Sequence, residues 1–412
     1  MAWFIRPALG PLLIIVWLLV LAACSSDGPA PTPTVTPNPT IPSSSLATLD
    51  IIQARAAELR GLEFLEEMDR NFMARDELEA FLMADLGEED REDMLKMQQV
   101  MAVLGLIPQD ADLYQLLLDL YVEQILGLYD PDTEQMYLIG DPDQFGPRAE
   151  VTLAHEYVHA LQQQHFDIRA LREAVDEDPE ALDALTALIE GDAYLHSLGY
   201  ISAFLTPEER EQAFQGSDAG SSIFDAAPYA VQQLFLFSAR EGLAFVTDLA
   251  RRRGQSAIND AFLRPPVTTE QVLHLEKYLQ AEGAISVSLP DLAGALGAGW
   301  VQVDGHVLGE YFLRTYLETG ASKQAAAVAA AGWGGGRYLL LEGPGQQRLF
   351  VALTVWDTEA DAQEFVAEAL APLASVPRQG YARVDGARAL LIVAPSAALV
   401  RTVRAQFPGF SD

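Results

Sequence analysis

The sequence predicts an α+β fold that is predominantly helical and ends in a small α/β unit. Apolar residues recur at intervals of three and four, the period of a helix, through most of the first 330 residues. Two short strand-like segments, Leu126–Tyr129 and Gln135–Ile139, flank residues typical of a turn. After residue 331 the apolar period changes to that of strands.

Composition limits the classes of function. The chain has 412 residues, half of them hydrophobic, which is enough for one large domain or two smaller ones. Acidic residues outnumber basic ones 59 to 26, and the longest basic run is Arg251–Arg253. Because this net charge repels polyanions, we expect no nucleic-acid partner.

The first 24 residues have the pattern of an export signal. Arg6 supplies a positive charge, and the apolar stretch Leu12–Ala23 is shorter than the roughly 20 residues that span a bilayer. The stretch ends in Leu-Ala-Ala-Cys, which resembles the lipobox of bacterial lipoproteins. The resemblance implies that Cys24, the only cysteine, is lipidated and anchors the chain to a membrane outside the cytoplasm. An ordinary signal peptide with an incidental cysteine is the alternative.

Residues 25–45 are rich in proline, threonine and serine and cannot form a core, so we expect a disordered linker. The linker would be followed by a catalytic domain over residues 46–330 and the small α/β unit over residues 331–412. An alanine- and glycine-rich segment, residues 325–336, predicts a hinge between the two.

The first part of the domain is predicted to be helical. Helical spacing from residue 46 to about residue 105 includes Phe64, Met68 and Phe72, and a further helix is expected over residues 112–124. The two strand-like segments that follow predict a β-hairpin, whose edge could hold an extended peptide by backbone pairing.

The next helix carries the pattern that indicates a chemistry. Gly146-Pro147 predicts its start, and His155, Glu156 and His159 follow as His-Glu-Tyr-Val-His. Two histidines four residues apart lie on one helix face, so both imidazoles can bind one ion while the glutamate between them handles a proton. The pattern therefore predicts a zinc hydrolase.

A catalytic zinc site requires a third protein ligand. His165 has the spacing of a metzincin ligand, but Gln162 stands where that pattern needs glycine, and no methionine follows Met136. Glu190 is the better candidate, because it lies beside Gly191 in the apolar part of a helix that begins at Asp178-Pro179.

The segment TLAHEYVHALQQQHF, followed by a helix with EGDA, resembles the gluzincin division of the zincin metallopeptidases, and a group of uncharacterised bacterial lipoproteins with the same pairing. The resemblance implies that His155, His159 and Glu190 bind Zn²⁺ and that Glu156 is the general base. Asp192 would orient a ligand histidine, although its offset of two residues from Glu190 departs from the four found in thermolysin-like members.

Several residues are candidates for the group that donates a hydrogen bond to the oxyanion of the transition state. A capping signal at Thr268 predicts a helix that carries His274 and Tyr278 one turn apart on one face. Either could be the donor, or both could be half-buried packing residues. His196 is a lesser candidate, and His306 is expected on the surface near a helix start.

The remaining segments predict structure without recognisable chemistry. Helices are expected over residues 228–254, 306–318 and 358–370, and strands over residues 338–341, 349–355 and 389–393.

Together these patterns predict a membrane-anchored, extracytoplasmic zinc metalloprotease with a zincin-like catalytic domain and a β-hairpin before its active-site helix. Its expected partners are a protein or peptide substrate and a membrane. One alternative is a non-catalytic lipoprotein of the same fold with a binding or assembly role. Another is a zinc amidase that acts on a cell-wall bond. The patterns do not predict the oligomeric state.

Overall fold

The structure is a computed structural model that describes residues 43–85, 87–131, 133–140, 146–214 and 222–410 of the chain. The predicted export signal, with Cys24, lies outside the described residues, as does the linker up to residue 42. The linker prediction was wrong for residues 43–45, which form the first turn of a helix. No described helix is both long enough and apolar enough to cross a membrane.

The chain forms an α+β fold, as predicted, with helices in the majority. The helices before residue 255 are α1 (Ser43–Arg60), α2 (Arg75–Asp85), α3 (Glu88–Leu104), α4 (Leu113–Gln124), α5 (Pro147–Phe166), α6 (Ile168–Glu173), α7 (Pro179–Phe204), α8 (Pro207–Phe214), α9 (Ser222–Ala226) and α10 (Tyr229–Arg253). The later helices are α11 (Ser256–Leu263), α12 (Thr269–Leu273), α13 (Leu275–Leu279), α14 (Leu292–Leu296), α15 (Glu310–Glu318), α16 (Lys323–Ala330), α17 (Glu359–Ser375) and α18 (Ala397–Arg404).

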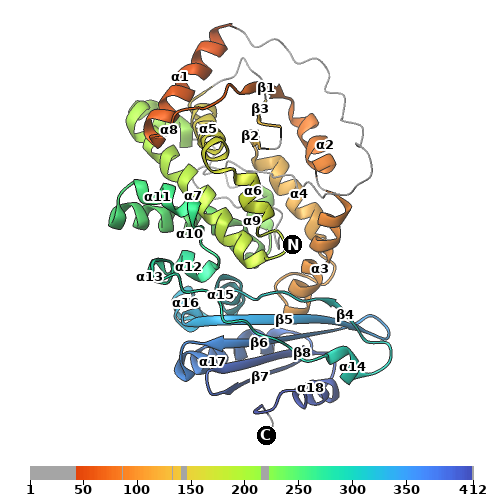
Figure 1. Cartoon of the computed structure of the whole chain (residues 1–412). Helices are drawn as coiled ribbons and strands as arrows, with labels where there is room; N and C mark the ends of the chain where they lie inside the picture. Colours follow the sequence, from red (N-terminus) through yellow and green to blue (C-terminus); the bar gives the residue numbers. More distant parts are fainter. Residues whose placement is uncertain (1–42, 86, 132, 141–145, 215–221, 411–412) are drawn as a thin grey trace.

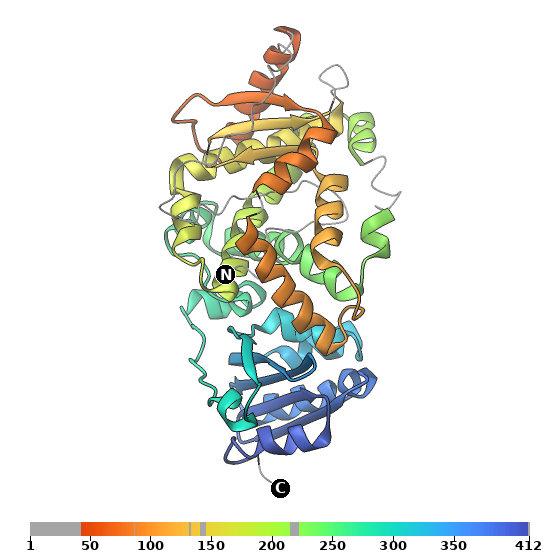
Figure 2. The same ribbon diagram turned by 90° about the vertical axis from the view of Figure 1, so that its right-hand side faces the viewer.

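A small sheet lies at one end of the molecule, next to α5 (Figures 1 and 2). Its strands are β1 (Asp69–Met73), β2 (Gly127–Asp130) and β3 (Gln135–Ile139), in the order β1-β3-β2. β2 and β3 form the predicted antiparallel hairpin.

The prediction of helix through Phe72 was wrong, because β1 pairs in parallel with β3 and Phe72 lies opposite Leu138. This pairing joins segments more than 60 residues apart, so the local apolar spacing could not reveal it.

A second sheet lies at the opposite end (Figures 1 and 2). Its strands are β4 (Val301–Asp304), β5 (Trp333–Gly343), β6 (Gln347–Trp356), β7 (Gln379–Asp385) and β8 (Arg388–Ala394). The order is β4-β5-β6-β8-β7, and every pair is antiparallel. β5, β6, β8 and α17 contain the segments predicted for this region, and α17 has the predicted N-cap, Thr358.

The hinge predicted over residues 325–336 was wrong. The segment contains the end of α16 and the start of β5. Its glycines serve close packing: a Cβ on Gly335 would lie 2.2 Å from the carbonyl oxygen of Ile285, and one on Gly336 would lie 2.7 Å from that of Leu308.

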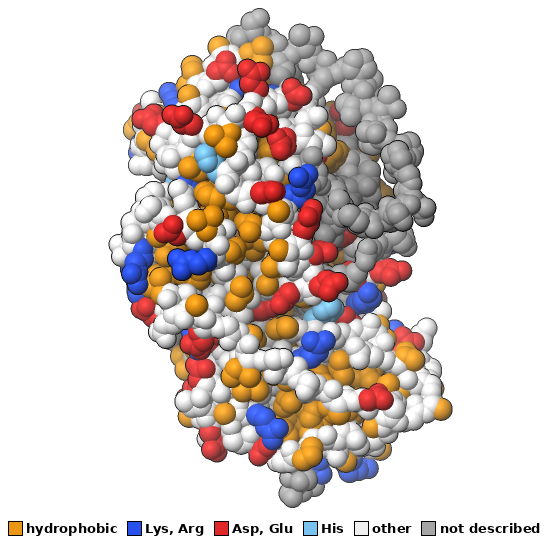
Figure 3. Space-filling model, viewed as in Figure 1, with side chains coloured by type: hydrophobic (Ala, Val, Ile, Leu, Met, Phe, Trp, Pro, Cys, Tyr) orange, Lys and Arg blue, Asp and Glu red, His pale blue; other side chains and the backbone are white. Residues whose placement is uncertain are grey.

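One hydrophobic core joins the helices to the C-terminal sheet. It includes Met97 and Met101 of α3, Tyr121 of α4, and Tyr338 and Phe350 of the sheet, all of them buried. The sheet is therefore packed against the helical part. Acidic residues outnumber basic ones in the chain, and Figure 3 shows acidic side chains spread over the face in view, with basic ones among them.

Helices α7 and α10 approach each other closely through glycine. A Cβ on Gly191 of α7 would lie 2.2 Å from the carbonyl oxygen of Gly242, and one on Gly242 would lie 2.1 Å from that of Ala187. Both distances are shorter than van der Waals contact, so a larger residue at either position must push the helices apart.

We expect Gly242→Ala to destabilise the fold by about 1–3 kcal/mol, because the added methyl group overpacks the contact between α7 and α10. Urea unfolding followed by circular dichroism measures the change. Gly283→Ala is the control, since a Cβ there meets no atom within 4 Å. Equal stability of the two variants would contradict the close contact.

The start of α7 is joined to α12 and α15 by a buried carboxyl group. Glu180 accepts hydrogen bonds from the backbone nitrogen and hydroxyl of Thr269, at 2.6 and 2.7 Å, and that hydroxyl oxygen accepts from the backbone nitrogen of Tyr311 at 3.2 Å. Burial raises the pKa of Glu180 to about 8, although the Thr269 bonds oppose the shift.

This pKa predicts a pH dependence of stability. In the unfolded chain the pKa of Glu180 is about 4.3, so between about pH 5 and pH 8 only the folded state holds the proton, and stability falls as the pH rises. Glu180→Gln keeps the acceptor for Thr269 and removes the titration, so we expect its stability to fall less over this range. Urea unfolding at both pH values compares the two proteins. Asp183, whose pKa burial raises to about 7, is present in both, so parallel losses would contradict the assignment to Glu180.

Candidate metal centre

The first helix of the candidate site is α5, which begins where the sequence predicts. Gly146 is its N-cap, Pro147 its first residue, and Glu150 places a carboxylate in the first turn, where the helix dipole favours it. The residues from 151 to 163 are all buried. His155 and His159 lie one turn apart, and their ring centroids are 4.6 Å from each other.

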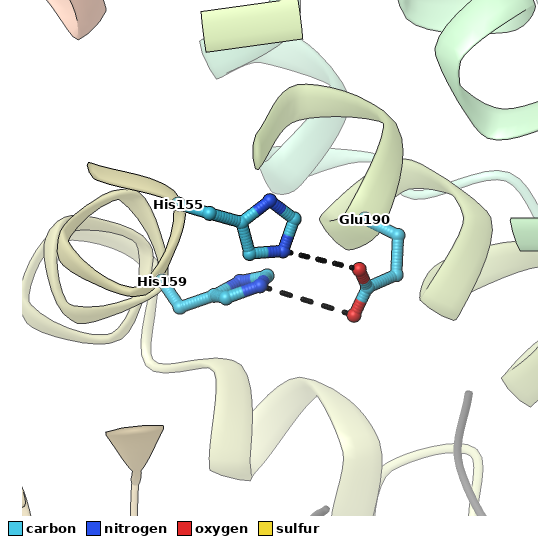
Figure 4. A group of neighbouring side chains, drawn as sticks. All are labelled: His155, His159 and Glu190. Atoms are coloured by element: carbon cyan, nitrogen blue, oxygen red, sulfur yellow. Dashed lines mark ion pairs between the residues drawn. The ribbon is translucent and has the colours of Figure 1, made fainter. Parts of the chain in front are cut away.

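The second helix is α7. Its N-cap, Asp178, accepts hydrogen bonds from the backbone nitrogens of Glu180 and Ala181, and Pro179 is its first residue. The helix is apolar on nearly every face, which is typical of a helix buried on all sides. Glu190 lies in its middle and faces α5 (Figure 4).

The structure brings the three predicted ligands together. The Nε2 atom of His155 lies 3.4 Å from Oε2 of Glu190, and Nε2 of His159 lies 3.9 Å from Oε1 (Figure 4). All three side chains have no solvent exposure. Ligand atoms about 2.1 Å from a tetrahedral zinc ion are about 3.4 Å apart, so these separations suit one ion.

Hydrogen bonds on the far sides of the rings orient both histidines. The hydroxyl of Ser197 donates to the carbonyl of Ala193 at 2.8 Å, so its oxygen accepts from Nδ1 of His155 at 3.2 Å. The amide nitrogen of Gln162 donates to the Ile189 carbonyl at 2.9 Å, which turns its oxygen towards Nδ1 of His159 at 2.8 Å. This network assigns the proton of each ring to Nδ1 and leaves the lone pair of each Nε2 facing Glu190.

These groups fit a divalent metal ion. Burial, and then the neighbouring His155, lower the pKa of the His159 imidazole well below its usual range, which favours the neutral, metal-binding form. Among the described residues, Nε2 of His155 and both carboxylate oxygens of Glu190 are buried without a hydrogen-bond partner. Nitrogen lone pairs directed at a buried carboxylate repel it unless a cation lies between them.

The predicted base, Glu156, is held beside the hairpin. Its Oε2 atom accepts a hydrogen bond of 3.0 Å from the backbone nitrogen of Tyr129 in β2. Gly127 allows the strand to lie against α5, since a Cβ there would be 2.9 Å from Cγ2 of Thr152 and 3.3 Å from Cγ of Glu156. Glu156 is fully buried and so is β2, which means that the strand edge is not open to solvent.

Asp192 is connected to the candidate ligand His159 through the side chain of Gln162. Its Oδ2 atom accepts from Nε2 of Gln162 at 2.8 Å and from Nε of Arg60 at 2.9 Å, while Nδ1 of His196 lies 3.1 Å from Oδ1. Burial acts to raise the pKa of the Asp192 carboxyl, but Arg60, with His196 and Gln162, lowers it to about 2. The ionised carboxylate thus holds Gln162, which in turn holds His159.

The two candidate oxyanion donors, His274 and Tyr278, form hydrogen bonds with residues outside the group of His155, His159 and Glu190. The single helix predicted to carry both is wrong, because it ends at His274, where φ is −127° and ψ is 88°, and a second short helix follows. Nε2 of His274 lies 2.9 Å from Glu310, and the hydroxyl of Tyr278 donates to the Arg264 carbonyl at 3.0 Å.

His274 ends α12, which packs at the start of α7, whereas the ring of Tyr278 in α13 packs edge to face on Phe245 of α10. Thr269 of α12 binds Glu180, which precedes Glu190 by ten residues, or about 15 Å of helix.

The other histidines contact residues outside the group of His155, His159 and Glu190. His165, rejected as a ligand, is hydrogen-bonded to the Glu63 carbonyl at 2.8 Å. His196 belongs to the group around Asp192. His306 precedes α15, as expected, and is partly buried with its Nε2 atom 3.1 Å from Asp304.

Three residues of the site were not predicted in their roles, namely Ser197, Gln162 and Arg60. Ser197 follows Glu190 by seven residues, and Gln162 follows His159 by three, so helical spacing already puts each on the face of a ligand. Arg60 gives no comparable signal, because it comes from a helix more than 100 residues away in sequence.

A second group of acidic side chains, Glu270, Glu282 and Asp357, also lies close together. The ammonium group of Lys277 contacts all three carboxylates, at 3.1 Å from Glu270 and 2.7 Å from Asp357. The ammonium group of Lys277 therefore occupies the place between these carboxylates that a metal ion would take.

Comparison with known proteins adds a match only at the C-terminal end. Residues 299–405 match a family model described as a domain of unknown function, DUF8575. This region contains the second sheet and excludes all residues of the candidate metal centre. No curated protein and no solved structure matches the chain.

We expect the purified chain to bind about one zinc ion, and His155→Ala and Glu190→Gln to abolish that binding, because each removes one of three ligands. Elemental analysis after dialysis measures the metal. His165→Ala is the control, since it removes a half-buried histidine of the same helix that is bonded to the Glu63 carbonyl. Retention of zinc by the ligand variants would refute the site.

Proposed function

We propose that the chain is a zinc-dependent metallopeptidase of the gluzincin type, anchored by Cys24 to the outer side of a bacterial membrane. The observation that carries the proposal is the buried group of His155, His159 and Glu190 around one point, with Glu156 on the same helix as the histidines. A structural zinc site would have no need of Glu156, whereas hydrolysis requires a base.

The chemistry divides between the ion and the chain. Zinc, when bound by the three ligands, would polarise the scissile carbonyl and make water a nucleophile near neutral pH. Glu156 would accept the proton of the attacking water and deliver it to the leaving amine. The backbone nitrogen of Tyr129 fixes one oxygen of Glu156, so the carboxylate needs little reorganisation before it accepts the proton. The two steps above do not use His274 and Tyr278, which are bonded to Glu310 and to the Arg264 carbonyl.

Burial of the site favours a second candidate function. His155, Glu156, His159 and Glu190 all have no solvent exposure, so a substrate reaches them only after part of the structure moves. A lipoprotein that uses the same ion to stabilise a binding or assembly fold needs no such movement. The two candidates differ in whether Glu156 changes the rate of a reaction.

We expect the chain to cleave an unstructured protein, and Glu156→Gln to lower kcat/KM by about a hundredfold or more with its zinc content unchanged. Mass spectrometry of the products measures cleavage. Glu150→Gln is the control, because it removes another carboxylate of α5 that pairs with Arg55 and lies outside the cluster. Unchanged cleavage in Glu156→Gln would refute the mechanism.

The same proteins separate the remaining alternatives. Zinc binding without cleavage of proteins or cell-wall amides would favour the binding role. Cleavage of a cell-wall amide alone, again dependent on Glu156, would identify an amidase.

A further inference from the structure

The feature behind this inference is the end of α1, where Arg60 enters the site from outside the two ligand helices. Its side chain is 1% exposed, and its Nε atom donates to Oδ2 of Asp192, which is itself fully buried, at 2.9 Å. The guanidinium also lies 5.9 Å from the ring centre of Phe166, at the end of α5. Arg60 thus packs between α5 and α7.

The same carboxylate oxygen holds the side chain that orients a ligand. Oδ2 of Asp192 accepts from Arg60 and from the amide of Gln162, and the oxygen of that amide faces Nδ1 of His159. Three successive contacts of 2.9, 2.8 and 2.8 Å therefore join the guanidinium to the imidazole, and every side chain involved is buried.

We propose that Arg60 is a positioning residue for the metal ligand His159, acting through Asp192 and Gln162. This inference rests on the proposed metal site. The guanidinium keeps the Asp192 carboxylate in one orientation, so the amide nitrogen of Gln162 has a fixed acceptor. The amide nitrogen also donates to the Ile189 carbonyl. Without Arg60 this is its one fixed acceptor, so in part of the molecules the amide can turn and present its nitrogen to Nδ1 of His159. The ring then holds its proton on Nε2, and that atom cannot bind a metal ion.

Another arginine of α1 provides a matched control. Arg55 is paired with Glu150 of α5 at 3.1 Å and also donates to the hydroxyl of Tyr200, so it joins α1 to both ligand helices. Neither partner belongs to the chain of contacts that leads to His159. A residue that only fastens α1 to the domain should therefore behave like Arg55.

The test measures zinc affinity by competition with a chelator for the full chain and for Arg60→Gln, Arg60→Lys and Arg55→Gln. We expect Arg60→Gln to weaken zinc binding by about ten- to a hundredfold, as is typical when a partner of a ligand histidine is lost. Arg60→Lys restores part of the affinity because it keeps the charge, and Arg55→Gln changes stability alone. Equal zinc affinity in Arg60→Gln and the parent chain would overturn the proposal.

The double variant Arg60→Gln with Asp192→Asn shows whether Arg60 acts through Asp192. We expect its loss of affinity to be no larger than the greater of the two single losses, since both remove the same connection. Additive losses would mean that Arg60 acts by another route and would overturn the proposal.

A second readout is independent of metal binding. In the metal-free protein labelled with ¹⁵N-histidine, the nitrogen shifts report which ring nitrogen of His159 carries the proton. We expect Nδ1 in the parent chain and in Arg55→Gln, and a mixture of both forms in Arg60→Gln. If the parent chain bound no zinc, the proposed function would fail, and this comparison would still decide the role of Arg60. An unchanged His159 signal in Arg60→Gln would overturn it.

Discussion

The structure around the candidate site depends on one constraint: polar side chains between α5 and α7 have no access to water, so each must find its partner inside the protein. Ser197 and Gln162 satisfy the Nδ1 sides of His155 and His159. The Nε2 sides of both rings consequently face Glu190. The orientation that a metal ion requires therefore follows from hydrogen bonds made away from the ion.

Two neighbouring residues of α7 lie on different sides of the helix and contact different helices. Glu190 faces α5, whereas Gly191, about 100° further around the helix, lies against the backbone of Gly242 in α10. Because Gly191 has no side chain, the backbone of α10 can contact the backbone of α7 on this side of the helix. Buried on one side by the site and on another by α10, α7 has little freedom to shift Glu190 relative to the histidines. This rigidity suits either a catalytic ion or a structural one.

Local signals in the sequence predicted the parts of this arrangement that depend on neighbouring residues. Cap residues marked the starts of α5 and α7, and spacing put His155 and His159 on one face, so the three candidate ligands could be named in advance. Contacts between distant segments left no such signal. Strand β1 and the ion pair of Arg60 each require a partner more than 60 residues away, and the break at His274 accompanies its contact with Glu310 in α15. The offset of Asp192 from Glu190 differs from the four residues found in thermolysin-like peptidases. Gln162 explains how that offset still reaches a histidine.

The ion pair between Arg60 and Asp192 is difficult to explain by stability alone. Removing two charges from water costs several kcal/mol per ion, and well-packed apolar residues often stabilise a fold as much or more. What apolar residues could not supply is the second acceptor of the Gln162 amide, which adds to the Ile189 carbonyl in holding the amide oxygen towards His159. Arg60 ends α1, whose first residues overlap the end of the predicted linker, so the proposed role of Arg60 would couple the candidate metal centre to the packing of that helix.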